Sequence, residues 1–399
     1  MESKGFSKLR LQRMHDVLTG FVERGELSGM VTLVSRKGEV HVEELGMHAI
    51  NGNAPMRRDT IFRIASMTKP ITAVAAMILV EQCKLRLDEP LDHLLPELAN
   101  HKVLRSLNSP LDDFVPAKRS ITLRDLLTFR LGIGAVMAPP DTYPIQTAMD
   151  EAGLSPGPNP PTLRSDEWMK RLGKLPFIHQ PGESWMYHTG SDILGIVIER
   201  ASGKQLEDFF RESIFEPLGM KDTSFYVPPE KMDRLPPSYI RNRTTGELTV
   251  HDDPNHSRWG RIPVFQSGGG GLVSTVDDYH AFCKMMVNKG SYGRERILSR
   301  PSVELMTTDH LTSAQRMSSR TFFGDSSSWG FGVGVNIQRD DLFSVPGRFG
   351  WDGGIGTSGY SDPAEDMIGI LMTQRLMDSP APSNVYIDFW TLAYQAIDD

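Results

Sequence analysis

The sequence predicts an α+β fold in which strands from both chain ends form one antiparallel sheet, flanked by helices, with a helical region inserted between its two halves. Three observations predict it. Short β-rich runs lie near both termini, helical periodicity dominates the stretch between them, and the composition is that of a globular protein. Of 399 residues, 39% are apolar and 23% are charged, which excludes disordered, collagen-like and coiled-coil classes.

The N-terminal segment changes from helical to β periodicity. Apolar residues recur at helical spacing over residues 6–22, which predicts an opening amphipathic helix. Residues 30–36 and 39–45 then form two β-rich runs, joined by Lys37-Gly38 as a turn. This pattern predicts an antiparallel hairpin directly after the first helix.

The C-terminal segment supplies further strands. Residues 331–338 and 367–374 are rich in β-favouring side chains, and residues 385–396 have the pattern of a closing helix. Because strands are expected at both ends of the chain, the simplest architecture joins them in one sheet.

The middle of the chain predicts a mainly helical domain of residues 69–229, set into an α/β domain of residues 1–68 and 230–399. Its expected helices cover residues 71–85, 123–129, 191–201 and 206–214. Residues 138–161 contain seven prolines, which exclude a regular helix and predict a rigid loop. A ligand cleft is expected where sheet and helices meet, with this loop as one wall.

Charge and apolar patterning exclude several kinds of partner. The net charge is −7 and no basic stripe is present, so nucleic acid is not an expected partner. No run approaches the roughly 18 apolar residues of a membrane span, and the N-terminus lacks the apolar core of a secretory signal. Cys83 and Cys283 each lie in an apolar stretch, where we expect buried, unpaired thiols. Together these features predict a cytoplasmic protein without a membrane partner.

Several common catalytic and ligand-binding motifs are incomplete in this sequence. The run Gly356-Thr357-Ser358-Gly359-Tyr360 breaks the G-x-S-x-G nucleophile elbow. The four glycines 268–271 are not followed by the Lys of a phosphate-binding loop. The acidic and histidine side chains of residues 251–256 fit no zinc or calcium spacing. No metal or organic cofactor is therefore expected.

One S-x-x-K run, Ser66-Met67-Thr68-Lys69, has an informative setting. An extended segment leads into it and an apolar helix follows, so Ser66 is expected at a helix N-terminus, where free N–H groups can stabilise an oxyanion. Side chains at i and i+3 share one helix face, which brings the Lys69 amine to the Ser66 hydroxyl. Partial desolvation by the apolar helix would lower the pKa of that amine enough to accept or relay a proton.

At these residues the chain resembles the serine β-lactamase and penicillin-binding-protein superfamily, and most closely its class C-like branch, the family VIII carboxylesterases. The resemblance extends from about residue 29 to residue 374 and includes residues 121–128, 180–187, 194–203, 214–223 and 267–274. It implies the α+β fold of that superfamily. The usual His-Thr-Ser-Gly that follows the segment matching residues 121–128 is Phe-Arg-Leu-Gly at residues 129–132, a departure from the pattern.

The second family element is Tyr-x-Asn, which here is Tyr187-His188-Thr189. By resemblance, Tyr187 is the base that activates Ser66 and later the hydrolytic water, with Lys69 acidifying its phenol. A phenol with a pKa of about 10 needs a nearby cation to ionise at neutral pH. Thr189 replaces the Asn that would grip an acylamino group, which makes amide substrates less expected.

The third family element, usually Lys-Thr-Gly, has two candidates. His188-Thr189-Gly190 matches in part, but it abuts Tyr187 and precedes a helix; Trp351-Asp352-Gly353-Gly354 occupies the expected place before the last strand. By resemblance to esterases with Trp at this position, Trp351, Asp352 and Gly353 contact substrate, and the N–H groups of Ser66 and Gly354 form the oxyanion hole. Core packing of Trp351 and simple turns at the glycines remain alternative interpretations.

The resemblance therefore implies a serine carboxylesterase for short to medium acyl chains. It would work through an acyl-enzyme on Ser66, with Lys69 and Tyr187 as the other catalytic residues. An apolar Trp351 in place of a lysine favours neutral groups over the carboxylate of a β-lactam. β-Lactam hydrolysis, acyl transfer to an alcohol or amine, and a non-catalytic binding protein on the same scaffold remain open. The expected partner is a small-molecule ester or lactam, and the oligomeric state is not predicted.

Overall fold

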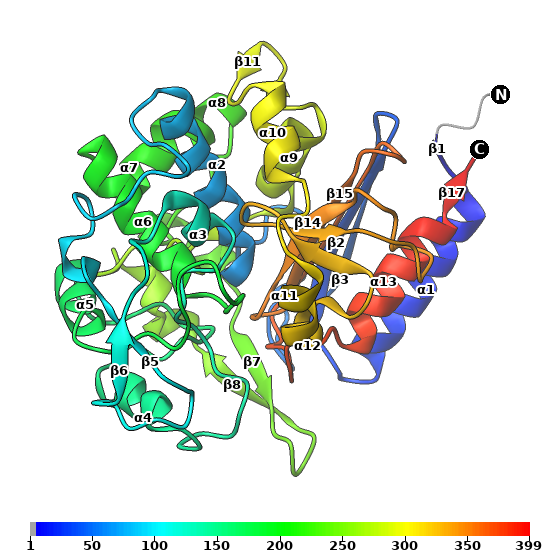
Figure 1. The fold of residues 1–399 in the computed structure, drawn as a ribbon. Coiled ribbons are helices and arrows are strands. Elements are labelled where there is room, and N and C mark those ends of the chain that lie inside the picture. The colour runs from blue at the N-terminus through cyan, green and yellow to red at the C-terminus, as the bar shows by residue number, and fades with distance from the viewer. Residues whose placement is uncertain (1–4) are drawn as a thin grey trace.

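A seven-stranded antiparallel sheet joins the two ends of the chain. The computed structural model describes residues 5–399 and orders the strands β12-β13-β14-β15-β16-β2-β3, so β16 of the C-terminal segment pairs with β2, the first strand of the N-terminal hairpin (Figure 1). The strands are β2 (Gly29–Arg36), β3 (Glu39–Gly46), β12 (Ser327–Trp329), β13 (Gly334–Asn336), β14 (Phe349–Gly353), β15 (Thr357–Asp362) and β16 (Met367–Thr373). The predicted α+β fold with a sheet from both chain ends is confirmed.

The hairpin β2–β3 forms where the sequence predicts it. Lys37 and Gly38 both have positive φ, 48° and 81°, and connect Arg36 to Glu39 in register. Two successive positive φ angles match the right-handed twist of paired strands. Strand β2 is buried throughout and β3 is half exposed, so β2 lies inside the sheet and β3 at its edge.

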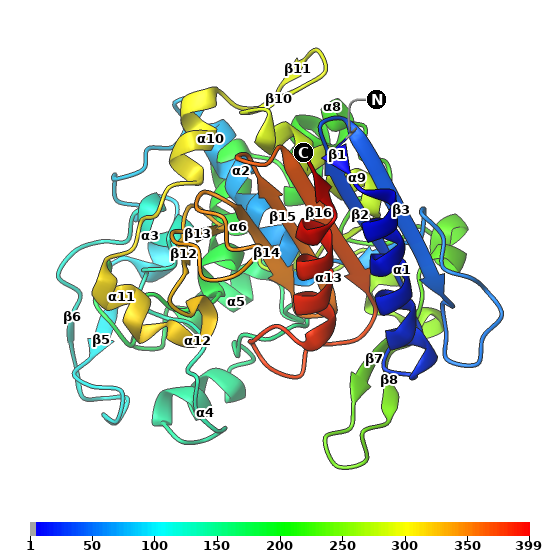
Figure 2. The ribbon, with the colours of Figure 1, turned by 90° about the vertical axis from the view of Figure 1, so that its right-hand side faces the viewer.

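Two helices from opposite chain ends cover one face of this sheet. Helix α1 (Lys8–Glu23) and helix α13 (Asn384–Gln395) lie side by side across the strands (Figure 2), and α9 (Val276–Val287) packs on β15, β16 and β2. Gly369 of β16 lies directly under the Trp390 ring of α13, where a Cβ would overlap the indole. The predicted opening and closing helices are both confirmed.

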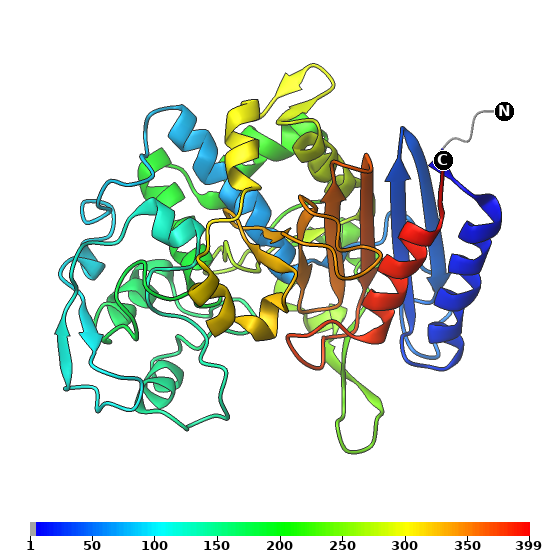
Figure 3. The same ribbon diagram turned by 45° about the vertical axis from the view of Figure 1, so that its right-hand side comes forward.

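The remaining helices form a mainly helical region beside the sheet (Figure 3). Its centre is α2 (Thr68–Glu81), whose residues from Thr68 to Leu79 are all buried and which packs against α6 and α7. The region contains α3 (Leu123–Leu127), α4 (Pro144–Glu151), α5 (Ser165–Leu172), α6 (Thr189–Ser202), α7 (Leu206–Phe210) and α8 (Glu216–Leu218), and α10 (Arg300–Met306), α11 (Ser313–Ser318) and α12 (Arg320–Phe323) follow α9. One apolar core includes side chains of β2, α2 and α6 and so spans sheet and helices. The domain boundaries at residues 68/69 and 229/230 stay a prediction.

Short two-stranded pairs complete the fold. They are β1 (Gly5–Phe6) with β17 (Ile397–Asp398), β4 (Phe62–Arg63) with β9 (Val273–Ser274), β5 (Lys102–Leu104) with β6 (Phe114–Pro116), β7 (Ser238–Arg241) with β8 (Leu248–Asp252), and β10 (Ser291–Tyr292) with β11 (Glu295–Arg296). No helix within residues 5–399 is both long and apolar enough to cross a membrane.

The structure corrects two expectations. Residues 138–161 are not a continuous loop, because α4 begins at Pro144, where the fixed φ and missing N–H of proline are compatible with the first helical turn. Cys83 is exposed rather than buried, since it follows the end of α2, whereas Cys283 is buried as expected; both thiols are free.

Candidate active site

Ser66 lies in a tight turn that opens helix α2. A 3₁₀ turn at Ala65–Met67 runs directly into α2, and Ala65 has a positive φ of 44°. Left-handed backbone at a non-glycine residue is strained and is often found at functional sites. The turn is held from behind because Ile64 donates its N–H to the Leu272 carbonyl, next to the β4–β9 pair. Ser66 is thereby presented at the N-terminus of a buried helix.

Lys69 is buried completely and faces Ser66. Its ammonium donates to Ser66 Oγ at 2.8 Å and to the Gly269 carbonyl at 2.6 Å. Burial lowers the pKa of Lys69 from its usual 10.5 to about 7, and the charge of Asp192 opposes that shift. An amine that is half deprotonated near neutral pH, in contact with a hydroxyl, can take the proton of that hydroxyl.

Asp192 of α6 is a site residue that sequence reasoning missed. Its Oδ1 accepts from Ser267 Oγ at 2.6 Å and from the Gly269 N–H at 3.0 Å, while the carbonyl of Gly269 receives Lys69. Burial raises the pKa of Asp192, and Lys69 acts in the opposite direction. The available signal was an acidic side chain five residues after Tyr187, at the start of an otherwise apolar run. Asp192 fixes the peptide that binds Lys69 and supplies a counter-charge.

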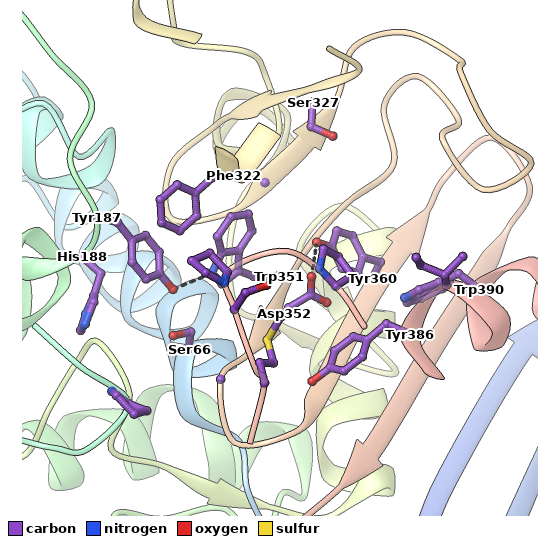
Figure 4. Close-up of a pocket in the computed structure, with 18 of the residues that line it drawn as sticks. Ser66, Tyr187, His188, Phe322, Ser327, Trp351, Asp352, Tyr360, Tyr386 and Trp390 are labelled. Atoms are coloured by element: carbon purple, nitrogen blue, oxygen red, sulfur yellow. Dashed lines mark hydrogen bonds between the residues drawn. The ribbon is translucent and has the colours of Figure 1, made fainter. Parts of the chain in front are cut away.

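Tyr187 comes to the same point from the segment before α6. Its ring centre lies 4.5 Å from Lys69 Nζ, and its hydroxyl accepts a hydrogen bond from Trp351 Nε1 at 2.8 Å. Figure 4 shows the phenol hydroxyl directed toward Ser66 and Trp351. Burial raises the pKa of the Tyr187 phenol, against the lowering effect of its hydrogen bonds to Ser66 and Trp351. The structure thus brings the three predicted catalytic side chains together, with a phenol that is protonated at rest.

The third element lies on β14, at the edge of the same cavity. Trp351 packs edge-on against Trp329 and reaches Tyr187. Asp352 accepts from Ser358 Oγ at 2.6 Å, so its carboxylate is held by the neighbouring strand. Gly354 lines the cavity beside Ser66.

Two residues of the candidate motifs lie elsewhere. Gly353 is not among the cavity-lining residues; it packs against the Ile64 carbonyl, where a Cβ would overlap, and so allows β14 to approach the Ser66 turn. Thr189, in the place of the family asparagine, lines a separate hollow behind residues 153–162 instead of the cavity at Ser66. His188 lies between the two spaces and borders both.

The cavity at Ser66 has a volume of about 480 Å³ and extends from the helical region to α13. Pro156, Gly157 and Pro158 form one wall, as predicted for the proline-rich segment. The other end reaches Tyr386 and Trp390 (Figure 4). Its lining is mostly apolar and aromatic, which suits the apolar part of an organic substrate.

No group of three or more His, Cys, Asp or Glu side chains within residues 5–399 could hold a metal ion. Among the residues 251–256, Asp252 instead pairs with the buried guanidinium of Arg63.

Comparisons with known proteins bear on the family and the fold of this chain. The sequence model of the family described as Beta-lactamase matches residues 14–387. Protein Rv1367c of Mycobacterium tuberculosis is 37% identical over 371 residues, covering 89% of this chain and 88% of its own. Esterase EstB of Burkholderia gladioli is 31% identical over 278 residues, 67% of each chain. The solved structure of EstCE1, described as a hydrolase with promiscuous acyltransferase activity, has a TM-score of 0.80 at 25% identity and covers 96% of this chain and 98% of that chain.

Proposed function

Because the chain belongs to the beta-lactamase family, which has esterase and acyltransferase members among its relatives, we propose that it is a serine carboxylesterase. Ser66 attacks the ester carbonyl and forms an acyl-enzyme, which water then hydrolyses. The observation that carries this proposal is the 2.8 Å contact between the Lys69 amine and Ser66 Oγ at the end of an apolar cavity. Within the family, we propose that the chain belongs to the family VIII carboxylesterases, which the Trp351 motif resembles.

Lys69 takes the first proton in this proposal. Its pKa is lowered to about 7, whereas the pKa of Tyr187 is raised by burial, so the amine is the stronger candidate for the resting base. This differs from the role expected from the sequence, where Tyr187 activates Ser66. Tyr187, held by Trp351, then passes a proton to the departing alkoxide and later draws one from the attacking water. Lys69 returns its proton to Ser66 Oγ when the carboxylic acid leaves. The N–H groups of Ser66 and Gly354 serve as the proposed oxyanion hole.

Trp351 supports esters over β-lactams as the main substrates. Its indole occupies the position where related enzymes carry a lysine, and it donates its N–H to Tyr187 instead of offering a cation to a substrate carboxylate. Thr189 faces away from the cavity and so supplies no amide for an acylamino group. We expect ester groups with short to medium acyl chains to fit the aromatic lining beside Ser66.

A fluorophosphonate probe and a substrate pair test this proposal. The probe should form one covalent adduct per protein chain, located on the peptide that contains Ser66. The enzyme should cleave p-nitrophenyl acetate with a higher kcat/KM than nitrocefin. A higher kcat/KM for nitrocefin would make β-lactam hydrolysis the main activity. Absence of both the adduct and turnover would leave a non-catalytic binding protein.

Acyl transfer is the second enzymatic candidate, favoured by the similarity to EstCE1. Its test is to add an alcohol or amine acceptor to the ester assay and to quantify ester, amide and free acid. If hydrolysis is the main reaction, free acid remains the dominant product at every acceptor concentration. A transferred product that outpaces free acid would reassign the enzyme as a transferase.

Replacing Asp192 with asparagine should shift the acid limb of the kcat/KM profile to lower pH. Asparagine keeps an oxygen for Ser267 and Gly269 but removes the charge that raises the pKa of Lys69. Because the free amine is the proposed base, activity rises as pH passes the Lys69 pKa, and that midpoint should fall by about one unit. The measurement is kcat/KM for p-nitrophenyl acetate across the pH range around neutrality.

The matched control for this pH shift is Glu199→Gln. Glu199 lies on the same helix, and burial raises its pKa too, but its carboxylate accepts from the Leu206 N–H and no effect of it on Lys69 is seen. Its midpoint should equal that of the wild type. An unshifted profile for D192N would show that Asp192 does not set the charge of Lys69.

A further inference from the structure

Arg348 is a buried cation at the far end of the Ser66 cavity. Among residues 5–399 it is the only Lys or Arg that lines this space, and its side chain is 4% exposed. Its guanidinium carbon lies 4.0 Å from the ring centres of both Tyr360 and Trp390. These two aromatic rings fix the position of the guanidinium through cation–π contacts.

The hydrogen-bond donors of Arg348 are mostly unused. Within the described part of the chain, Nε and Nη2 are buried without a hydrogen-bond partner, and Nη1 makes one long contact, 3.4 Å, to Asn336 Oδ1. No carboxylate of the described residues forms an ion pair with it. Because a guanidinium stays protonated in proteins, a buried one with free donors is expensive unless an anion is bound there.

The nearby acidic groups already have other partners. Asp352 accepts from Ser358 Oγ at 2.6 Å and from the Tyr360 hydroxyl at 3.4 Å, and burial raises its pKa. Asp362 accepts from the Tyr394 hydroxyl at 2.7 Å. Asp352 interacts electrostatically with Arg348, and Asp362 acts on Tyr394. Neither carboxylate accepts a hydrogen bond from the Arg348 guanidinium.

We propose that Arg348 binds a carboxylate of the substrate, so that the ester cleaved at Ser66 carries an acid group remote from the scissile bond. The unpartnered Nε and Nη2 form one edge of the guanidinium, which is buried in this structure; a movement of the side chain into the cavity would present two parallel N–H groups that match the two oxygens of a carboxylate. This inference rests on the proposed esterase function and names its substrate class.

The separation between Arg348 and Trp351 indicates how far the carboxylate of the substrate lies from its ester group. Arg348 directly precedes β14 and lies three residues before Trp351, which contacts Tyr187. At about 3.3 Å per extended residue, the two backbone positions lie roughly 10 Å apart. An extended carbon chain covers about 1.2 Å per bond. A carboxylate that reaches Arg348 is therefore separated from the ester by several methylenes or by a ring.

Two paired substrate series test the inference on wild-type enzyme. In the first, p-nitrophenyl half-esters of linear dicarboxylic acids, from succinic to dodecanedioic, are compared with fatty acyl esters of equal carbon number. In the second, acetyl esters of 4-hydroxyphenylalkanoic acids are compared with those of 4-alkylphenols, which places the acid on the alcohol side. One series should show an optimum length at which the acid-bearing ester has a kcat/KM about tenfold or more higher, the range of a charge-assisted bidentate contact.

Variants at the guanidinium locate the effect. R348M should remove the preference for the acid-bearing ester, and R348K should restore part of it, because lysine keeps the charge without the planar fork. N336D places a carboxylate next to Arg348 and should lower the same ratio, whereas N336A, its uncharged control, should not. The ratio of two esters on one enzyme preparation does not depend on the fraction that is folded.

The outcomes separate this inference from the esterase proposal. If wild-type enzyme cleaves neutral esters but neither series favours the acid-bearing member, the inference fails and the esterase function stands. An equal preference in wild type and R348M, or in N336D and N336A, also overturns it. If no ester of either kind acylates Ser66, the esterase proposal fails first.

Discussion

Replacing Lys69 with methionine should lower kcat/KM for esters by about 10²- to 10⁴-fold, the range of a lost general base, without destabilising the protein. The Lys69 amine contacts Ser66 Oγ, and its pKa of about 7 allows it to accept a proton near neutral pH. Methionine fills a similar volume and removes a buried amine that loses its hydration on folding. The measurements are ester turnover and thermal unfolding of the same preparations.

The stability difference between K69M and wild type should depend on pH. The folded-state pKa of Lys69 is lowered from 10.5 to about 7, so below that value the folded protein holds a buried charge. The unfolded chain binds the proton more tightly, so wild-type stability rises with pH from about 7 to about 10.5 and levels off above that. The gain in K69M should therefore be largest below neutral pH and vanish above the unfolded value. A variant that stays active, or a gain that grows with pH, would contradict this account.

Replacing Tyr187 with phenylalanine should also reduce kcat/KM by about 10²- to 10⁴-fold, but here stability should fall as well. The change removes the hydroxyl that lies between Ser66 and Trp351 and leaves the indole N–H of Trp351 without its acceptor. An unsatisfied buried donor costs about 1–3 kcal/mol. The ring itself stays, so its packing against Phe129, Trp185 and Phe322 is retained.

A double-mutant cycle separates the two consequences of Y187F. In W351F the Tyr187 hydroxyl loses its donor, and in the double variant neither the unpaired indole N–H nor the hydroxyl remains. The free energy of unfolding of the double variant should therefore lie closer to the wild type than the sum of the single changes predicts. Activity should stay at the Y187F level, because the proton relay is absent in both. Additive losses of stability would show that the Tyr187–Trp351 hydrogen bond contributes no interaction energy between the two residues.

Local sequence patterns predicted most of the fold correctly. The hairpin at residues 30–45, the opening and closing helices and the buried helix after Ser66 all appeared, since periodicity and turn residues act over a few positions. Where a local rule was too coarse, the prediction was wrong: the prolines of residues 138–161 exclude a continuous helix, yet Pro144 starts one. The prediction of a buried Cys83 was wrong for a similar reason, because the apolar run around it does not show that the residue lies just past the end of α2.

Some contacts of the active site follow from local sequence spacing and others do not. Spacing within one helix turn placed Lys69 beside Ser66, because side chains at i and i+3 must share a face. The proximity of Tyr187 was expected only through family resemblance. Its hydrogen bond to Trp351 joins residues 164 positions apart, and no periodicity encodes a contact of that range.

What the sequence by itself determined is therefore the set of elements, the sheet drawn from both chain ends, and the pairing of a hydroxyl with an amine on one helix turn. Only the tertiary structure decided the charges: the lowered pKa of Lys69, its link to Asp192 through Gly269, and the unpartnered donors of Arg348 beside Tyr360 and Trp390. The physical reason is that burial and hydrogen bonding depend on which distant segments surround a group, whereas helix and strand formation depend mainly on its immediate neighbours.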